Sequence, residues 1–288
     1  MQVIGSGSIA VVLALSVAVA AGAQSKSKGR FAPAGSNVVT VTANEYAFDM
    51  PTSIPAGLTT FRLVDKGKEP HHLFVMKLEQ GKTASDLFAA LKAAGPAGGP
   101  PPAWMRPVGG PNAPVPGGGE SNATLVLEPG EYAALCVIPT PQGAPHFMMG
   151  MVKGFTVTPS VRRAVAALPK ADLTITLKDY DFVLSRPLTS GRHVIAITNA
   201  ASQPHEIVIN RFGPGQTAAK FAAWGEKPEG RTVPSHPMGG LTDIPPGKTV
   251  VIEGNFPPGR YGFVCFTRDK KDGKPHHVHG MMREFVVK

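Results

Sequence analysis

The sequence is poor in aromatic residues and in cysteine. Only 7% of its 288 residues are aromatic and two are cysteine, whereas glycine (33) and proline (29) are abundant. No basic stripe is interleaved with aromatics, which gives no support for nucleic-acid binding. There is also no Ser-His-Asp pattern, phosphate-binding loop or paired-carboxylate motif. This composition favours a turn-rich, all-β protein.

The sequence also has no apolar run long enough to cross a bilayer at its N-terminus. The run from Ile9 to Ala20 is too short for a span and ends at the small residues Ala21-Gly22-Ala23. Residues 1–23 are therefore predicted to be a signal peptide, although no Lys or Arg precedes Ile9. We expect a protein exported to the periplasm or the extracellular space, with no stable membrane insertion after cleavage.

What the sequence does contain is an internal repeat. Five positions of the first half, advanced by 134, reach equivalent residues of the second: Val39, Tyr46, Phe48, Gly57 and His71 reach Leu173, Tyr180, Phe182, Gly191 and His205. Later positions keep offsets of 129 or 130. Such a constant offset indicates a duplication. We predict a domain at 37–158, a linker at 159–171 and a second domain at 172–288.

The repeat carries the same metal-binding residue types in each half. Each half has a Pro-His pair, a later Gly-x-Tyr-x-x-x-Cys strand, and then Pro-His followed after four residues by Met, with Gly directly before that Met. Two imidazoles, a thiolate and a thioether are the donors of a blue-copper centre. Two alternatives remain for the cysteines. An exported protein could join them in a disulfide, although equivalent positions of two domains rarely come close enough, and a lone cysteine is often a buried, inert thiol.

The apolar pattern predicts a sandwich of short strands in each half. Val39–Thr42 and Leu173–Thr176 alternate apolar and polar residues, as half-buried strands do. One helix is expected in each half, at Ala84–Ala93 and Ala218–Trp224. A Gly- and Pro-rich insertion, 95–119, follows the first helix and has a shorter counterpart in the second half, and both contain Pro-x-Gly-Gly. It is either a loop over the metal-proximal end or a surface excursion.

With these motifs the chain resembles the cupredoxin family, most closely plastocyanin and pseudoazurin. The resemblance covers both repeats and implies two tandem Greek-key β-sandwich domains, each with one short helix and one type 1 copper. By position it implies the following ligands: His71, Cys136, His146 and Met151 in the first domain, and His205, Cys265, His276 and Met281 in the second.

The chain departs from this family between the cysteine and the second histidine. Nine residues separate them in the first half and ten in the second, against two or so in small cupredoxins. About two doublings of loop length cost roughly 1.3 kcal/mol of closure entropy, whereas metal binding supplies on the order of 10 kcal/mol. Turn residues such as Pro139, Gly143 and Asp272-Gly273 predict that the extension returns as a small hairpin.

Other histidines lie beside these ligands. His72 has Glu206 as its counterpart and is expected to face solvent. His277 and His279 replace Phe147 and Met149 and are expected to be exposed, with a second weak metal position or a replacement ligand as the alternative.

The function predicted from these residues is one-electron transfer by an exported two-domain copper protein. Copper storage, delivery or resistance is one alternative, and a metal-free binding module on the same fold is another. Two-domain cupredoxins include enzymes that wire the cysteine copper to a second copper through adjacent histidines. Cys136 and Cys265 lack such neighbours, so the prediction is that the chain is not an enzyme. The formal charge of +9 favours an acidic redox partner protein.

Overall fold

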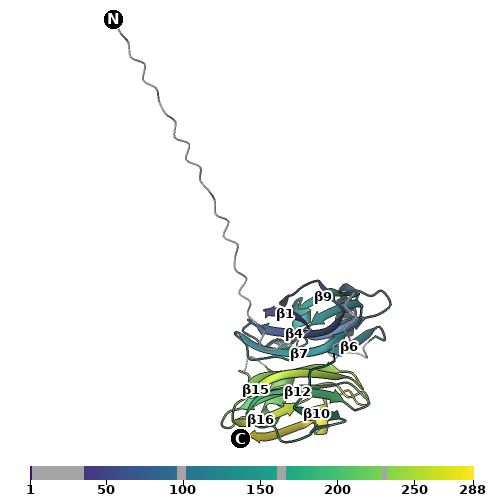
Figure 1. Cartoon of the computed structure of the whole chain (residues 1–288). Coiled ribbons are helices and arrows are strands. Elements are labelled where there is room, and N and C mark those ends of the chain that lie inside the picture. Colours follow the sequence, from purple (N-terminus) through teal and green to yellow (C-terminus); the bar gives the residue numbers. More distant parts are fainter. Residues whose placement is uncertain (2–35, 96–101, 161–166, 229–231) are drawn as a thin grey trace. The chain divides into compact units, whose positions relative to one another are not determined.

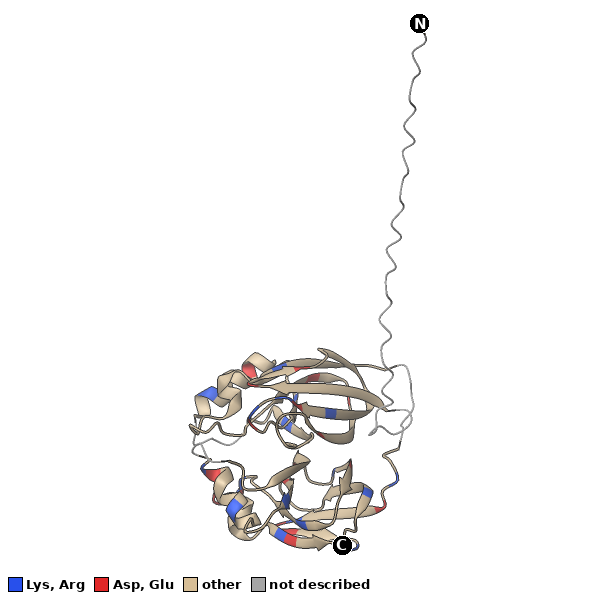
Figure 2. Ribbon diagram, turned by 90° about the vertical axis from the view of Figure 1, so that its left-hand side faces the viewer, with Lys and Arg blue, Asp and Glu red and all other residues tan. Residues whose placement is uncertain are grey.

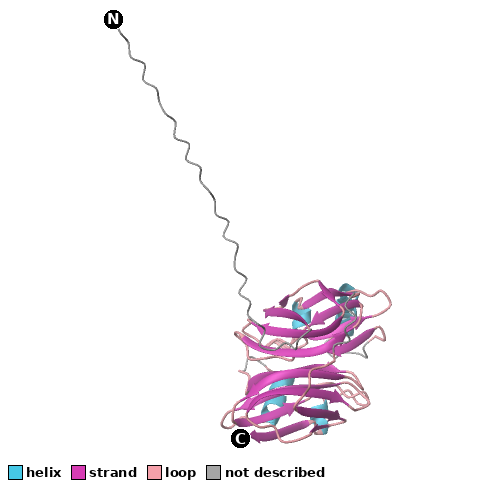
Figure 3. Cartoon of the chain, in the orientation of Figure 1, coloured by secondary structure: helices cyan, strands magenta, loops and turns pink. Residues whose placement is uncertain are grey.

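The computed structural model describes residues 1, 36–95, 102–160, 167–228 and 232–288. The predicted signal peptide lies outside these residues, as do parts of the linker and of both insertions. In the described part, strands dominate and each half contains one α-helix (Figure 3). Residues 31–288 form one compact unit. The predicted all-β fold is confirmed, whereas the exact domain boundaries stay a prediction.

The first half (residues 37–158) contains nine strands, one α-helix and one 3₁₀ turn. They are β1 (Asn37–Asn44), β2 (Ala47–Asp49), β3 (Ser53–Pro55), β4 (Gly57–Asp65), β5 (Phe74–Leu78), α1 (Ala84–Ala94), β6 (Met105–Gly109), β7 (Gly119–Leu127), β8 (Gly130–Leu135), η1 (His146–Met149) and β9 (Val152–Thr158). The second half (172–288) repeats this order without a counterpart of β3. It contains β10 (Leu173–Lys178), β11 (Asp181–Leu184), β12 (Gly191–Asn199), β13 (His205–Phe212), α2 (Ala218–Glu226), β14 (His236–Ile244), β15 (Thr249–Phe256), β16 (Gly259–Val264), η2 (His276–His279) and β17 (Met282–Val287).

Each half is a sandwich of two sheets, the architecture of a cupredoxin (Figure 1). One sheet of each half carries the candidate ligands at its ends, in the orders β3-β9-β8-β5-β6 and β14-β13-β16-β17. The other two sheets join at β7 and β15, where Thr124 pairs with Val251, into one eight-stranded sheet. The buried apolar residues of both halves form one continuous cluster. The sequence did not predict this joint core.

The local sequence explains the elements. Val39, Val41 and Ala43 of β1 are buried and the residues between them are more exposed, so the period of two gives the strand an inner face. Helix α1 begins at a capping box, in which Thr83 and Asp86 satisfy each other's backbone N–H groups. Leu87 of α1 and Phe221 of α2 each bury against the ligand-bearing sheet of their own half. Both predicted helices are confirmed.

In their described parts the Gly- and Pro-rich insertions are not surface excursions. The end of the first one lies at the metal-proximal end, one of the two alternatives expected: Gly117 N–H donates to the Gly67 carbonyl and Gly118 N–H to that of Asp65, whose side chain accepts the His71 N–H.

The insertions form β6 and β14, and the residues that follow β6 cross to the second half through the bridges Pro111–Leu241 and Pro114–Met238. The Pro-x-Gly-Gly repeat has a steric reason. A Cβ on Gly110 would lie 2.0 Å from the carbonyl oxygen of Leu73, and one on Gly240 would lie 1.9 Å from that of Ile207. Only glycine permits these approaches.

Candidate metal centres

The fold brings the predicted histidines and cysteine of each half together. Site 1 is the group His71, Cys136 and His146, and in each group one donor atom of every residue lies within 4.8 Å of the others. Site 2 is the group His205, Cys265 and His276. All six side chains are fully buried. Cys136 and Cys265 follow β8 and β16 directly, so the same strand end delivers the sulfur in both halves.

Both cysteines are free thiols, so the disulfide alternative is wrong. Burial raises the pKa of the Cys136 thiol to about 12 and also raises the pKa of Cys265. Without a cation beside it, each sulfur therefore stays protonated. A bound metal ion supplies the positive charge that deprotonates such a thiol.

The donor atoms of site 1 have the spacing of ligands that share one metal. Nδ1 of His71 lies 3.0 Å from Nδ1 of His146, and the latter lies 3.5 Å from Sγ of Cys136. Nitrogens each about 2.0–2.1 Å from a metal ion have this separation when both bind it. In site 2, Sγ of Cys265 lies 3.4 Å from Nδ1 of His276 and 3.9 Å from Nδ1 of His205. Both groups fit a type 1 copper ion, one in each half.

In each half a carboxylate fixes which nitrogen of one imidazole faces the site. In site 1, Nε2 of His146 lies 2.9 Å from Glu69, and in site 2, Nε2 of His205 lies 3.0 Å from Asp179. A carboxylate accepts the Nε2 proton and leaves the lone pair on Nδ1, the nitrogen directed at the cysteine. Burial lowers the pKa of His71, His146 and His276 to about 4, so these imidazoles are neutral near pH 7.

The predicted axial residues Met151 and Met281 are also fully buried. Met151 N–H donates to the His146 carbonyl at 3.1 Å, and Cys136 N–H donates to the Met151 carbonyl at 3.2 Å. Met281 makes the same two bonds with His276 and Cys265 at 3.0 and 3.2 Å. Two backbone bonds thus place each methionine beside two members of its site. That these methionines coordinate the metal stays a prediction.

The long segments between cysteine and histidine form the expected hairpins. Pro139 pairs with Pro145 in the first half and Arg268 with Pro275 in the second. Each histidine then begins a 3₁₀ turn that ends at a left-handed glycine, Gly150 with φ of 101° and Gly280 with φ of 97°. The turn reverses the chain and places the methionine against the cysteine strand.

Two expectations about neighbouring histidines are wrong. His72 is buried rather than exposed, and its Nε2 accepts the Val137 N–H at 3.0 Å. Its counterpart Glu206 is buried as well and accepts the Phe266 N–H at 2.8 Å. These side chains satisfy the backbone N–H of the residue that follows each cysteine. The sequence did not show that His72 and Glu206 have the same role. They are different residue types, and what they share is the ability to accept a hydrogen bond.

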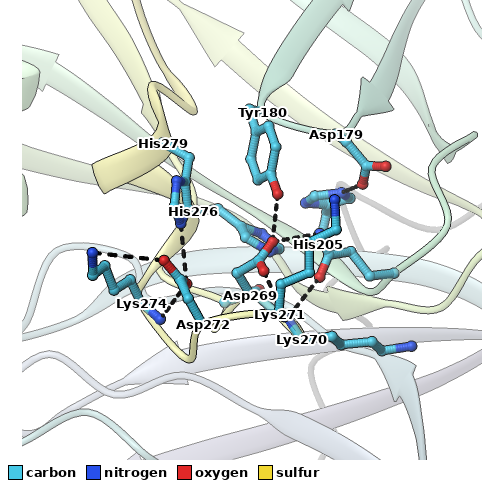
Figure 4. Close-up of polar contacts among 12 residues, drawn as sticks. Asp179, Tyr180, His205, Asp269, Lys270, Lys271, Asp272, Lys274, His276 and His279 are labelled. Atoms are coloured by element: carbon cyan, nitrogen blue, oxygen red, sulfur yellow. Dashed lines mark hydrogen bonds and ion pairs between the residues drawn. The ribbon is translucent and has the colours of Figure 1, made fainter.

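His277 is buried too, with its ring against Phe266 and Nε2 3.5 Å from Glu226. His279 is exposed, as predicted, and pairs with Asp272 at 3.2 Å (Figure 4). One donor atom of His279 lies near Asp269 and Asp272 in a third possible metal group. However, the oxygens of Asp269 already accept bonds from Tyr180, Gln203 and the Lys271 N–H. The second weak metal position stays untested.

Four carboxylates and two tyrosines near the ligands were not predicted. Tyr46 and Tyr180 have positive φ values, 61° and 67°, and each contacts a ligand histidine by its ring edge. The repeat alignment contained Tyr46 and Tyr180, which was the available signal. Glu45 and Asp179 had the same signal, because Glu45 advanced by 134 reaches Asp179, whereas Glu69 and Asp269 had none, because Glu69 aligns with Gln203 and the two occupy different positions of the repeat.

Comparisons with known proteins return only distant similarities. No family model matches the chain, and no curated protein matches it. A solved auracyanin from Roseiflexus castenholzii is 22% identical over 43% of this chain and 98% of its own, with a TM-score of 0.31. A multicopper oxidase is 13% identical over 91% of this chain and 93% of its own, with a TM-score of 0.23. A copper nitrite reductase from Nitrosomonas europaea is 15% identical over 88% and 94%, with a TM-score of 0.25.

The prediction that the chain is not an enzyme is contradicted, because oxidases and nitrite reductases are among these matches. The missing histidines beside Cys136 and Cys265 exclude only one way of wiring a second copper. Among the described residues, no helix is long and apolar enough to cross a membrane.

Proposed function

We propose that this chain is an exported protein that holds one copper ion in each half and transfers single electrons. The observation that carries the proposal is that two equivalent groups of two Nδ1 atoms and one Sγ converge in fully buried sites. Copper with this donor set supplies reversible one-electron chemistry. Glu69 and Asp179, on the outer nitrogens of His146 and His205, would hold these two imidazoles in one orientation.

Burial favours electron transfer over the alternative of storage or delivery. His71, Cys136 and Met151 are all 0% exposed, so a receiving protein could not reach the ligands without opening the sandwich. Delivery proteins exchange copper through accessible soft ligands. The structure offers such access at neither site within the described residues.

The partner and the location belong to the same proposal. A net charge of +9 would attract an acidic redox protein by long-range steering. In Figure 2, Lys and Arg occur in both halves, with Asp and Glu among them. The small-residue sequence Ala21-Gly22-Ala23 supports export, and N-terminal sequencing of the periplasmic or secreted protein should then begin at Gln24.

Copper loading tests the central claim. The purified protein should retain two copper ions per chain after desalting and show a Cys-to-copper charge-transfer band. The bound copper should then cycle between oxidation states with ascorbate and a mild oxidant without loss to a Cu(I) chelator. A colourless protein without copper would support the metal-free module, and rapid loss to the chelator would support delivery.

A further inference from the structure

One buried amide of the first half reaches the surroundings of site 2. Asn112 is 3% exposed, and its Nδ2 donates to Oε2 of Glu206 at 3.2 Å. Its Oδ1 accepts the Ala113 N–H and its carbonyl accepts the Ser121 hydroxyl, at 2.8 and 2.6 Å. These bonds hold the amide so that its donor faces the other half.

Glu206 connects directly to site 2. It follows His205 in the chain, and its backbone N–H lies 3.4 Å from Sγ of Cys265. Its other carboxyl oxygen, Oε1, accepts the N–H of Phe266, the residue after Cys265. The side chain that Asn112 contacts is therefore covalently joined to one candidate ligand and hydrogen-bonded beside another.

The opposite end of the same segment connects to site 1. Pro111 precedes Asn112, and its carbonyl accepts the N–H of Leu73 at 3.0 Å. Leu73 lies two residues after His71. A continuous run thus leads from His71 through Leu73, Pro111, Asn112 and Glu206 to His205, and only two of its links are hydrogen bonds.

We propose that this run is the electronic contact between sites 1 and 2, with Asn112 as its link between the halves. The inference rests on the proposed function. One electron passes from Cu(I) in one site to Cu(II) in the other, so the first copper is oxidised as the second is reduced. No atom, proton or co-reactant is transferred.

The contact is asymmetric although the chain is duplicated. The repeat equivalent of Asn112 is Thr242, whose N–H and hydroxyl donate to the Gly110 carbonyl at 2.9 and 3.3 Å instead of to His72. The equivalent of Glu206 is His72, and its described hydrogen bond goes to Val137 within its own half. Among the described residues, the hydrogen bond between Asn112 and Glu206 therefore has no equivalent between Thr242 and His72.

The chain offers a matched control. Asn122 is also buried, at 5% exposure, and also joins the halves: it donates to the Glu253 carbonyl at 2.7 Å and accepts the Glu253 N–H at 2.8 Å. Asn122→Leu removes an inter-half amide of equal size that lies outside the run. Asn112→Asp serves beside Asn112→Leu, because it keeps an acceptor for the Ala113 N–H and replaces the amide donor by a carboxyl group that faces the Glu206 carboxyl.

The experiment uses the full chain loaded with copper. Cys136→Ser and Cys265→Ser provide the absorption and EPR spectrum of each single site. Partial pulse reduction of the two-copper protein then gives the rate at which the electron redistributes. Asn112→Leu and Asn112→Asp should slow this rate several-fold at unchanged copper content, whereas Asn122→Leu should leave it near that of the parent protein.

A metal-free measurement accompanies the rate. In the apoprotein, Asn112→Leu should increase the rate at which Cys265 reacts with a thiol reagent and leave the rate for Cys136 unchanged. The reason is that Glu206, which lies beside Cys265, loses its hydrogen bond from Asn112, whereas the surroundings of Cys136 lose none. Equal slowing by Asn112→Leu and Asn122→Leu would show that the interface between the halves is loosened in general, and would overturn the proposed electronic contact. An unchanged rate in both Asn112 variants would overturn it as well. A parent protein that holds no copper would overturn the proposed function itself.

Discussion

Sites 1 and 2 have the same donors but hold their two histidines in opposite ways. In site 1 the second histidine, His146, is bound closely by Glu69 at 2.9 Å, while His71 lies 4.0 Å from Glu45. In site 2 the first histidine, His205, is bound closely by Asp179 at 3.0 Å, while His276 lies 3.8 Å from Asp269. The duplication therefore preserves the donors and the carboxylate beside the first histidine, because Glu45 and Asp179 are equivalent positions, whereas the carboxylate beside the second histidine, Glu69 or Asp269, comes from a different position in each half.

The largest expected effect is the loss of one site at a time. Cys136→Ser and Cys265→Ser should each remove about half of the charge-transfer band, because each sulfur belongs to one buried group. Copper analysis and the optical spectrum of each variant measure the effect. A variant that loses the whole band would show that the two sites do not form independently, which would end the comparison between them.

Removal of the close carboxylates should sharpen the comparison. Replacing a hydrogen-bond partner of a ligand histidine costs about 10–100-fold in metal affinity. Glu69→Gln should therefore weaken site 1 more than Glu45→Gln does, and Asp179→Asn should weaken site 2 by a similar factor. Competition with a copper chelator measures each affinity, with the cysteine of the other site replaced by serine. If Glu45→Gln weakens site 1 as much as Glu69→Gln does, the distances do not decide which carboxylate matters.

The equivalent residues His72 and Glu206 should give the metal-free protein opposite pH dependences. Burial, with the charge of Asp243, raises the pKa of Glu206 from 4.5 to about 8. The folded state then binds this proton more tightly than the unfolded state, so the stability it contributes is lost as pH rises from about 4.5 through 8. Burial lowers the pKa of His72 from 6.5 to about 3, so its contribution is lost as pH falls below 6.5.

Substitution separates the two contributions. Glu206→Gln should flatten the decline in stability above pH 5, and His72→Gln should flatten the decline below pH 6.5, each by up to about 1.4 kcal/mol per pH unit for one proton. Thermal unfolding of the apoprotein across this range is the measurement. Identical pH profiles for the two variants would mean that other groups control the stability.

The smallest expected difference lies in the two tyrosines. Tyr180 donates to Asp269 at 2.5 Å, and Tyr46 donates to Glu69 at 3.3 Å. A hydrogen bond to a charged group contributes about 1.5–3 kcal/mol, and a long one contributes less. Tyr180→Phe should therefore destabilise the protein more than Tyr46→Phe, as measured by denaturant unfolding. Equal losses would show that the length of the hydroxyl's hydrogen bond does not determine how much it contributes.

The sequence by itself determined the duplication, the donor types, the strands and the two helices. Repeats and periodic burial are local or offset patterns, and metal donors are recognisable by residue type, so His71 and Cys136 could be named without coordinates. The hairpin before His146 was also predictable, because proline and glycine restrict the backbone wherever they occur.

Only the tertiary structure decided how the sites are surrounded and how the halves meet. Nothing in the sequence places Glu69 on His146 or Asn112 on Glu206, because these pairs are 77 and 94 residues apart and make a single contact each. The glycines of Pro-x-Gly-Gly looked like loop residues, yet they are required where β6 and β14 pass over a carbonyl. The prediction that His72 faces solvent was wrong for the same reason. Its burial depends on packing against the ends of other strands, which the local pattern of apolar and polar residues does not encode.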